Sequence, residues 1–153
     1  MNSTALAQHT VSATSALLKI SGLRLVLPQN EILALEAVAE VDARDAGPLS
    51  VGWLQHARQR WPVYCLAPDM SLLGAVPGER RACVLLGAAG GCVGILCDDV
   101  SIEQALKQRH ALPPAMYVAG TPVLGLIELE EGGIACVTDT QRLASHVARL
   151  VAA

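Results

Sequence analysis

The residues best placed to do chemistry are three carboxylates that lie close together in the sequence: Asp98, Asp99 and Glu103. Carboxylates grouped in this way can act as general acid and base, or they can hold a divalent cation. A simpler interpretation is that they end one strand and precede the N-terminus of a helix, where acidic side chains are favoured. We prefer the simpler interpretation and expect no carboxylate site here.

Other reactive residue types form no recognisable site. The five cysteines contain no C-x-x-C pair, and most fall in predicted strands, where a thiol acts as a small apolar side chain. The four histidines are scattered without ligand spacing, and no G-x-S-x-G elbow occurs. The glycines at 87–91 lack the G-x-G-x-x-G spacing of a phosphate cradle. We therefore expect no catalytic residues, no metal ion and no cofactor, and reduced thiols favour a cytoplasmic protein.

Length and composition restrict the class of protein further. A chain of 153 residues, 52% of them hydrophobic, is long enough for one domain, or two small lobes packed closely together, with a sizeable core. Only 3% of the residues are aromatic and the net charge is −3, which disfavours nucleic acid as a partner. No apolar run is long enough to insert into a membrane. Residues 1–14 lack the features of a secretion signal, so we expect a flexible tail before a domain at 15–153.

The stretch at 81–100 predicts the central element of the fold. Two short apolar strands, 82–86 and 92–97, are joined by a glycine-rich hinge. The second strand is apolar on both faces, because Val93, Ile95 and Cys97 alternate with residues that are also apolar or glycine. A strand of this kind is covered on both sides, so the core must continue past it into a second layer.

The segment at 51–66 predicts a second pair of strands. Trp53 and Leu54 should point to opposite faces of the first strand. A polar turn follows at Arg58-Gln59. Pro62, in the second strand, cannot donate a ladder hydrogen bond and should lie at an edge or a bulge.

Further strand pairs are predicted at 15–20 with 23–27 and at 123–129 with 134–137, and a helix is predicted at 138–152. Many short strands at close spacing indicate an all-β barrel or sandwich with a C-terminal helix. Four segments are less clear. They are 31–39 (a short helix or an extended segment), 69–73 (one helical turn capped by Asp69), 101–106 (helical spacing, with a strand as the alternative) and 117–118 (a short strand).

The order of these segments resembles that of CheW-like domains, the adaptor proteins of bacterial chemosensory arrays. The shared pattern is a strand ending in L-P, then G-x-[IL]-x-x-R-G-x-x-x-P-V-x-D-L, then V-G-[IL]-x-[VC]-D-x-V and P-P. The corresponding segments here lie at 23–28, 52–66, 93–100 and 113–114. The resemblance spans about residues 15 to 147, nearly the whole chain.

The resemblance implies a fold and a function. The fold would be two small five-stranded β-barrels that share a core. The protein would be a non-catalytic adaptor with two partners, the regulatory domain of a CheA-type histidine kinase and the cytoplasmic tip of a chemoreceptor. An apolar groove with a polar rim suits a receptor helix bundle. We expect Trp53, Leu54 and Trp61 to anchor the partner and His56, Arg58 and Arg60 to form the rim.

Alternatives remain at several points. The two tryptophans can also be explained by core packing, and the three basic residues by a solvated turn. The family usually carries Arg-Gly after its third strand, where this chain has Ala57-Arg58, and Cys65 replaces the family's Asp. These departures are typical of a divergent member, such as one in a system that controls twitching motility. A small barrel that binds a second messenger is the alternative function, although the R-x-x-x-R and D-x-S-x-x-G motifs of PilZ domains are absent. An enzyme with a hidden site is the other alternative class.

Overall fold

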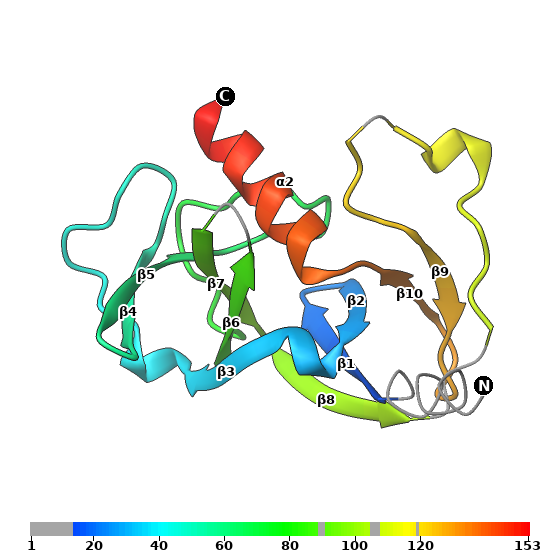
Figure 1. Ribbon diagram of the computed structural model, residues 1–153, viewed down its shortest axis with the longest axis horizontal. Coiled ribbons are helices and arrows are strands. Elements are labelled where there is room, and N and C mark those ends of the chain that lie inside the picture. The colour runs from blue at the N-terminus through cyan, green and yellow to red at the C-terminus, as the bar shows by residue number, and fades with distance from the viewer. Residues whose placement is uncertain (1–13, 89–90, 105–107, 119) are drawn as a thin grey trace, which may run out of the picture.

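Ten strands form two curled five-stranded sheets, and a C-terminal helix packs between them (Figure 1). The computed structural model describes residues 14–88, 91–104, 108–118 and 120–153, and every statement below refers to these residues. The all-β class with a terminal helix is thus confirmed, as is the arrangement in two small five-stranded units. The expected tail at 1–14 falls almost entirely outside the described residues.

The first sheet, barrel 1, has the strand order β8-β1-β2-β10-β9. Its strands are β1 (Thr14–Ile20), β2 (Leu23–Pro28), β8 (Asp99–Gln104), β9 (Gly125–Glu128) and β10 (Ile134–Val137). All neighbours are antiparallel except β10 and β2, which run parallel.

The second sheet, barrel 2, repeats this plan with the order β3-β6-β7-β5-β4. Its strands are β3 (Ile32–Ala37), β4 (Gly52–His56), β5 (Gln59–Tyr64), β6 (Ala82–Ala88) and β7 (Gly91–Cys97). Here β5 and β7 form the parallel pair. Barrel 2 is continuous in sequence and is inserted into barrel 1 between β2 and β8.

Each barrel is closed by a single pair of residues beside a glycine. In barrel 2, Asp42 exchanges two backbone hydrogen bonds with Trp53, at 2.7 and 2.8 Å, and in barrel 1, His110 does the same with Leu126. A Cβ on Gly52 would lie 2.5 Å from the Asp42 carbonyl oxygen, and one on Gly125 would lie 2.6 Å from the carbonyl oxygen of His110. Only glycine therefore allows the closing segment to approach either barrel this closely.

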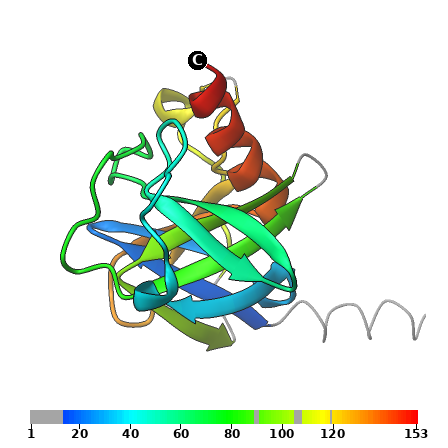
Figure 2. The ribbon, with the colours of Figure 1, turned by 90° about the vertical axis from the view of Figure 1, so that its left-hand side faces the viewer.

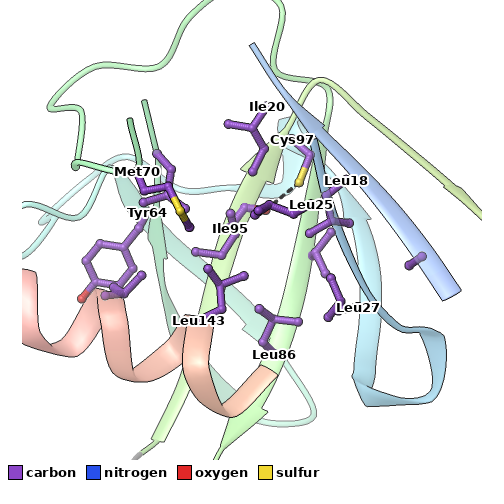
Figure 3. Close-up of a cluster of buried hydrophobic side chains, with 14 residues drawn as sticks. Leu18, Ile20, Leu25, Leu27, Tyr64, Met70, Leu86, Ile95, Cys97 and Leu143 are labelled. Atoms are coloured by element: carbon purple, nitrogen blue, oxygen red, sulfur yellow. Dashed lines mark hydrogen bonds between the residues drawn. The ribbon is translucent and has the colours of Figure 1, made fainter. Parts of the chain in front are cut away.

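The prediction for β7 is confirmed, because its two faces belong to two different hydrophobic clusters. Ile95 and Cys97 lie in the larger cluster, which fills the space between the barrels, while Leu96 lies inside barrel 2. Figure 3 shows side chains from β1, β2, β7 and the helix converging in the larger cluster, among them Leu18 and Leu143. The two barrels therefore share one core.

The helix α2 (Thr140–Ala152) begins where the sequence indicates, within two residues. Asp139 is the N-cap, and its side chain accepts a hydrogen bond from the Arg142 backbone N–H at 2.8 Å. Glu31, from the 3₁₀ turn before β3, accepts another from the Thr140 N–H at 2.9 Å. Leu143 and Val147 are buried in the shared core. Figures 1 and 2 both show α2 on the opposite side of the molecule from β8.

Two local predictions are wrong, and a third segment adopts the alternative that was left open. The segment at 101–106 could be a helix or a strand; its described residues, 101–104, belong to strand β8, because Val100 and Ile102 pair with Leu18 and Ala16 of β1. Asp69 does not cap a helical turn; its side chain accepts hydrogen bonds from the N–H and hydroxyl of Ser71 within a tight turn. Residues 117–118 are an exposed loop rather than a strand.

The two open questions about strands are also answered. The segment at 31–39 is mostly extended, as β3 flanked by two 3₁₀ turns, Gln29–Glu31 and Val38–Glu40. Pro62 was expected at an edge or a bulge, but β5 is an interior strand of its sheet and its pairing with β4 is regular. Pro62 is tolerated because the parallel pairing with β7 begins only at Val63. The missing N–H of Pro62 therefore leaves no gap in the ladder with β7.

Candidate functional site

The six residues predicted to bind a partner all lie on the β4–β5 hairpin, but they do not share one surface. Leu54 and Trp61 are 1% and 3% exposed and belong to the interior of barrel 2. Trp61 therefore packs in the core, which is the alternative that we considered for the two tryptophans, and Leu54 is buried in the same cluster. The other four, Trp53, His56, Arg58 and Arg60, lie at the surface, and we refer to them as the hairpin corner.

Trp53 is held in place from two sides. Its indole N–H donates a 2.7 Å hydrogen bond to the backbone carbonyl of Asp45. The Arg60 guanidinium lies 4.5 Å from the centre of its ring, a distance typical of a cation–π contact. Close by, Arg44 hydrogen-bonds Asp42 and lowers the pKa of that carboxyl to about 2. The corner therefore presents an ordered aromatic ring covered by a cation.

His56 connects the hairpin to the neighbouring edge strand. Its Nδ1 lies 3.6 Å from a carboxylate oxygen of Glu36 on β3, and its ring meets the edge of Trp61 at 6.1 Å. The Trp61 indole N–H donates to the His56 carbonyl oxygen at 3.2 Å. Since β3 and β4 are the two ends of the barrel 2 sheet, this contact links the hairpin corner to β3.

The turn of the hairpin consists of Ala57 and Arg58, both with positive φ (51° and 65°). Two consecutive positive φ values in a two-residue loop define a type I′ turn, which favours Asn-Gly. The turn therefore lies one residue earlier than Arg58-Gln59, the position expected from the sequence. A non-glycine residue at each position carries a steric cost, and Arg58 is held exposed at the tip.

A second surface was missed by the sequence analysis and lies where the two barrels meet. Leu35 pairs with Val84 and Ile102 pairs with Ala16, and both partners belong to the shared core. Directly opposed residues of antiparallel strands point to the same face, so Leu35 and Ile102 extend the shared core to the surface. They are 54% and 49% exposed.

Leu33, 57% exposed, lies at the bulge of β3 with its side chain over Gly87. Both β3 and β8 are edge strands of their sheets, and Figures 1 and 2 show them along the same side of the molecule. We call Leu33, Leu35 and Ile102 the inter-barrel edge. The alternation of leucines at 33 and 35 could have indicated it, had the segment been recognised as a strand.

A third apolar surface lies on the long connection between β8 and β9. Met116, Tyr117 and Val118 are 44%, 72% and 63% exposed, and we call them the loop knob. Three consecutive exposed apolar side chains on a loop are typical of a contact site rather than of scattered surface residues.

Of the three carboxylates considered first, Asp98 has a structural role, while Asp99 and Glu103 lie on strand β8 and not before a helix as expected. Asp98 receives a 2.7 Å hydrogen bond from the fully buried guanidinium of Arg80 and a 3.0 Å hydrogen bond from the Ser21 N–H. Arg80 also donates to the Ser21 hydroxyl and, at 2.6 Å, to the Leu66 carbonyl oxygen. This ion pair fastens the turn of the β1–β2 hairpin to the point where the chain leaves barrel 2.

The described residues contain no group of three histidine, cysteine or acidic side chains that could hold a metal ion. All five cysteines are free thiols; Cys65, Cys83 and Cys97 are buried, and burial raises the pKa of Cys83 to about 12. Within the same residues, no helix is both long and apolar enough to cross a membrane. The exposed surfaces described above are the candidate functional features.

Comparison with known proteins is informative only at the level of structure. No protein-family model matches the sequence, and no curated protein matches it. The fold is similar to that of the scaffolding protein TtCheW from Thermoanaerobacter tengcongensis, with a TM-score of 0.65 and 12% sequence identity. The alignment covers 86% of this chain and 87% of that protein. The chain therefore has a CheW-like fold.

Proposed function

We propose that this protein is a non-catalytic adaptor in a bacterial chemosensory pathway, coupling chemoreceptors to a CheA-type histidine kinase in the cytoplasm. The likeness to a scaffolding protein over nearly the whole chain supports a scaffold role in general. An adaptor needs at least two surfaces that can be occupied together. The presence of two separate exposed apolar surfaces, the inter-barrel edge and the loop knob, is the observation that carries the proposal.

The inter-barrel edge suits the cytoplasmic tip of a receptor, which is a helical bundle. An amphipathic helix binds by placing its apolar stripe against an apolar groove or edge. Leu35 and Ile102 supply such a surface. The contact between His56 and Glu36, the residue after Leu35 on β3, places the hairpin corner next to this surface. In this proposal the exposed cations Arg58 and Arg60 serve as a polar rim.

The loop knob suits the regulatory domain of the kinase. Tyr117 is the most exposed of the large hydrophobic side chains that the structure describes, at 72%. Tyrosine is enriched among residues that dominate binding energy, because it combines a large apolar area with a polar group. The knob lies on the β8–β9 connection, outside the two edge strands that form the receptor surface, so both partners have room to bind.

Binding of each purified partner to two variants tests the proposal. Leu35→Glu places a charge in the receptor surface and should weaken binding of a receptor-tip fragment at least about tenfold, while leaving kinase binding unchanged. Tyr117→Ala should have the converse effect. Val76→Glu, at an exposed apolar position outside both surfaces (42%), is the matched control. If the unmodified protein binds neither partner, or if both variants weaken both partners equally, the proposal fails.

A further inference from the structure

Each barrel is built from strands of both halves of the chain. The first half, residues 14–64, supplies β1 to β5, and the second half, residues 82–152, supplies β6 to β10 and α2. Each half contains a hairpin, a single strand and a second hairpin, in this order (β1–β2, β3 and β4–β5; β6–β7, β8 and β9–β10). Replacing every strand of one barrel by its counterpart from the other half gives the strand order of the other barrel. The chain therefore consists of two equivalent halves that have exchanged their first hairpins.

The equivalence of the halves extends to the way in which the strands pair. In both barrels the parallel pair joins the second strand of a first hairpin to the last strand of the other half, β2 to β10 and β7 to β5. In both halves the closing bridge reaches the residue after a glycine, Gly52 in β4 and Gly125 in β9. Figure 1 shows the mixing of the halves in barrel 1, where the blue strands β1 and β2 lie with the orange strands β9 and β10.

The contacts between the halves hold the fold together. Among the described residues, four strand pairings join one half to the other: β1 with β8, β2 with β10, β3 with β6, and β5 with β7. Within a half, the strands pair only as local hairpins, which are marginally stable alone in water. The shared core also draws on both halves, for example on Leu18 and Leu86. Each half thus needs the other to bury its apolar side chains, and the other half of a second copy offers the same surface.

The connection between the halves, residues 65–81, determines which copy supplies the partner half. Its first part is anchored, because Leu66 and Met70 are buried in the shared core. Residues 74–79 are mostly exposed and form no strand or helix, and both of their glycines have open space around them. Six residues span up to about 20 Å when extended. Opening this segment would let the second half of one copy fold onto the first half of another while the remaining contacts are kept.

We propose that two copies of this chain exchange halves to form a dimer, in which each barrel combines the first half of one copy with the second half of the other. A partner joined by a short flexible segment has an effective concentration in the millimolar range, so exchange competes with closure when the chain folds at about 1 mM. The dimer then persists on dilution, because separating the halves requires unfolding of the shared core. This inference does not rest on the proposed adaptor function. The exchanged dimer carries the inter-barrel edge, the hairpin corner and the loop knob twice.

Refolding of the full-length protein from urea at about 1 mM and at about 1 µM tests the proposal. Light scattering after size-exclusion chromatography should show a dimer from the concentrated sample and a monomer from the dilute sample, with the same circular dichroism. Lys19→Cys combined with Asp99→Cys reports the exchange, because these directly opposed residues belong to different halves. Their disulfide lies within one copy in the monomer but joins two copies in the exchanged dimer. Non-reducing electrophoresis should therefore show a covalent dimer only after concentrated refolding.

Gln55→Cys combined with Arg60→Cys is the matched control. These opposed, exposed residues of β4 and β5 both lie in the first half, so their disulfide stays within one copy whether or not the halves are exchanged. The control also shows any cross-linking through the five natural cysteines, which both double variants retain. The proposal is overturned if the concentrated sample stays monomeric, or if its dimer contains no disulfide between copies in the first double variant. It is equally overturned if both double variants give the same amount of covalent dimer, since association without exchange would then explain it.

Discussion

The ion pair between Arg80 and Asp98 offers the sharpest test of how the two barrels are held together. The guanidinium of Arg80 is fully buried, and the Asp98 side chain is 23% exposed. Asp98→Asn keeps the size of the side chain but removes its charge, leaving the arginine buried without a counter-ion. Two neutral acceptors would remain to it, the Ser21 hydroxyl and the Leu66 carbonyl oxygen.

The expected loss of stability follows from the difference in burial between Arg80 and Asp98. Removing one member of a buried ion pair costs about 3–5 kcal/mol, and the partial exposure of Asp98 places the expected loss near about 3 kcal/mol. For a chain of this length that loss corresponds to a fall in Tm of about 6–12 °C. Arg80→Met should cost less, because the remaining Asp98 reaches solvent and still accepts a hydrogen bond from the Ser21 N–H.

Urea unfolding followed by circular dichroism measures these differences, provided that the transition is two-state. Asp99→Asn is a matched control: the residue is adjacent but exposed and forms no ion pair among the described residues, so its stability should change by less than about 0.5 kcal/mol. The double variant Arg80→Met with Asp98→Asn should lose less than the sum of the two single variants. The reasoning is refuted if Asp98→Asn costs under about 1 kcal/mol, or if the double variant is additive.

Three further outcomes are expected. Arg58→Gly should stabilise the protein by about 0.5–1 kcal/mol in urea unfolding, because glycine relieves the positive φ of the turn at an entropic cost smaller than the strain; a loss of stability would contradict the type I′ turn. Gly52→Ala should cost about 1–3 kcal/mol, since its Cβ would meet the Asp42 carbonyl oxygen, whereas Gly74→Ala, with open space around it, should be nearly neutral; equal effects would argue against the closing bridge. Burial raises the pKa of Cys83 from 9.0 to about 12, so this thiol stays protonated in the folded protein while it ionises in the unfolded chain. The free energy of unfolding should therefore fall as pH rises from about 9 to 12, and a flat profile would contradict this burial.

The fold was largely predictable because its central strand has an unusual pattern. A strand that is apolar on both faces, as at Ile95 and Leu96, needs a core on each side, and the two clusters found around β7 meet that requirement. The strand β8 was harder to predict, because Ile102 has apolar neighbours at helical spacing in the sequence. Its extended form depends on pairing with β1, more than 80 residues earlier in the chain, and such tertiary pairing overrides local propensity.

The candidate surfaces were less predictable, and for a physical reason. Alternation shows that Trp53 and Leu54 face opposite ways, but it does not show which of the two faces is the interior of a barrel. The inter-barrel edge joins Leu35 and Ile102 from strands of different sheets, so its exposure depends on how the two sheets meet. The ion pair of Asp98 with Arg80 could not be predicted either, because the two residues are 18 positions apart and no local sequence pattern connects them.

The insertion of barrel 2 into barrel 1 has a consequence for the order in which the protein is made. All strands of barrel 2, residues 32–97, are synthesised and leave the ribosome before β8, β9 and β10 do. During that interval the β1–β2 hairpin has no neighbouring strand on either side, and only the outer face of β7 and β6 can cover its leucines. In the nascent chain, the β1–β2 hairpin must therefore pack against barrel 2 until the last third of the sequence supplies the other strands of barrel 1.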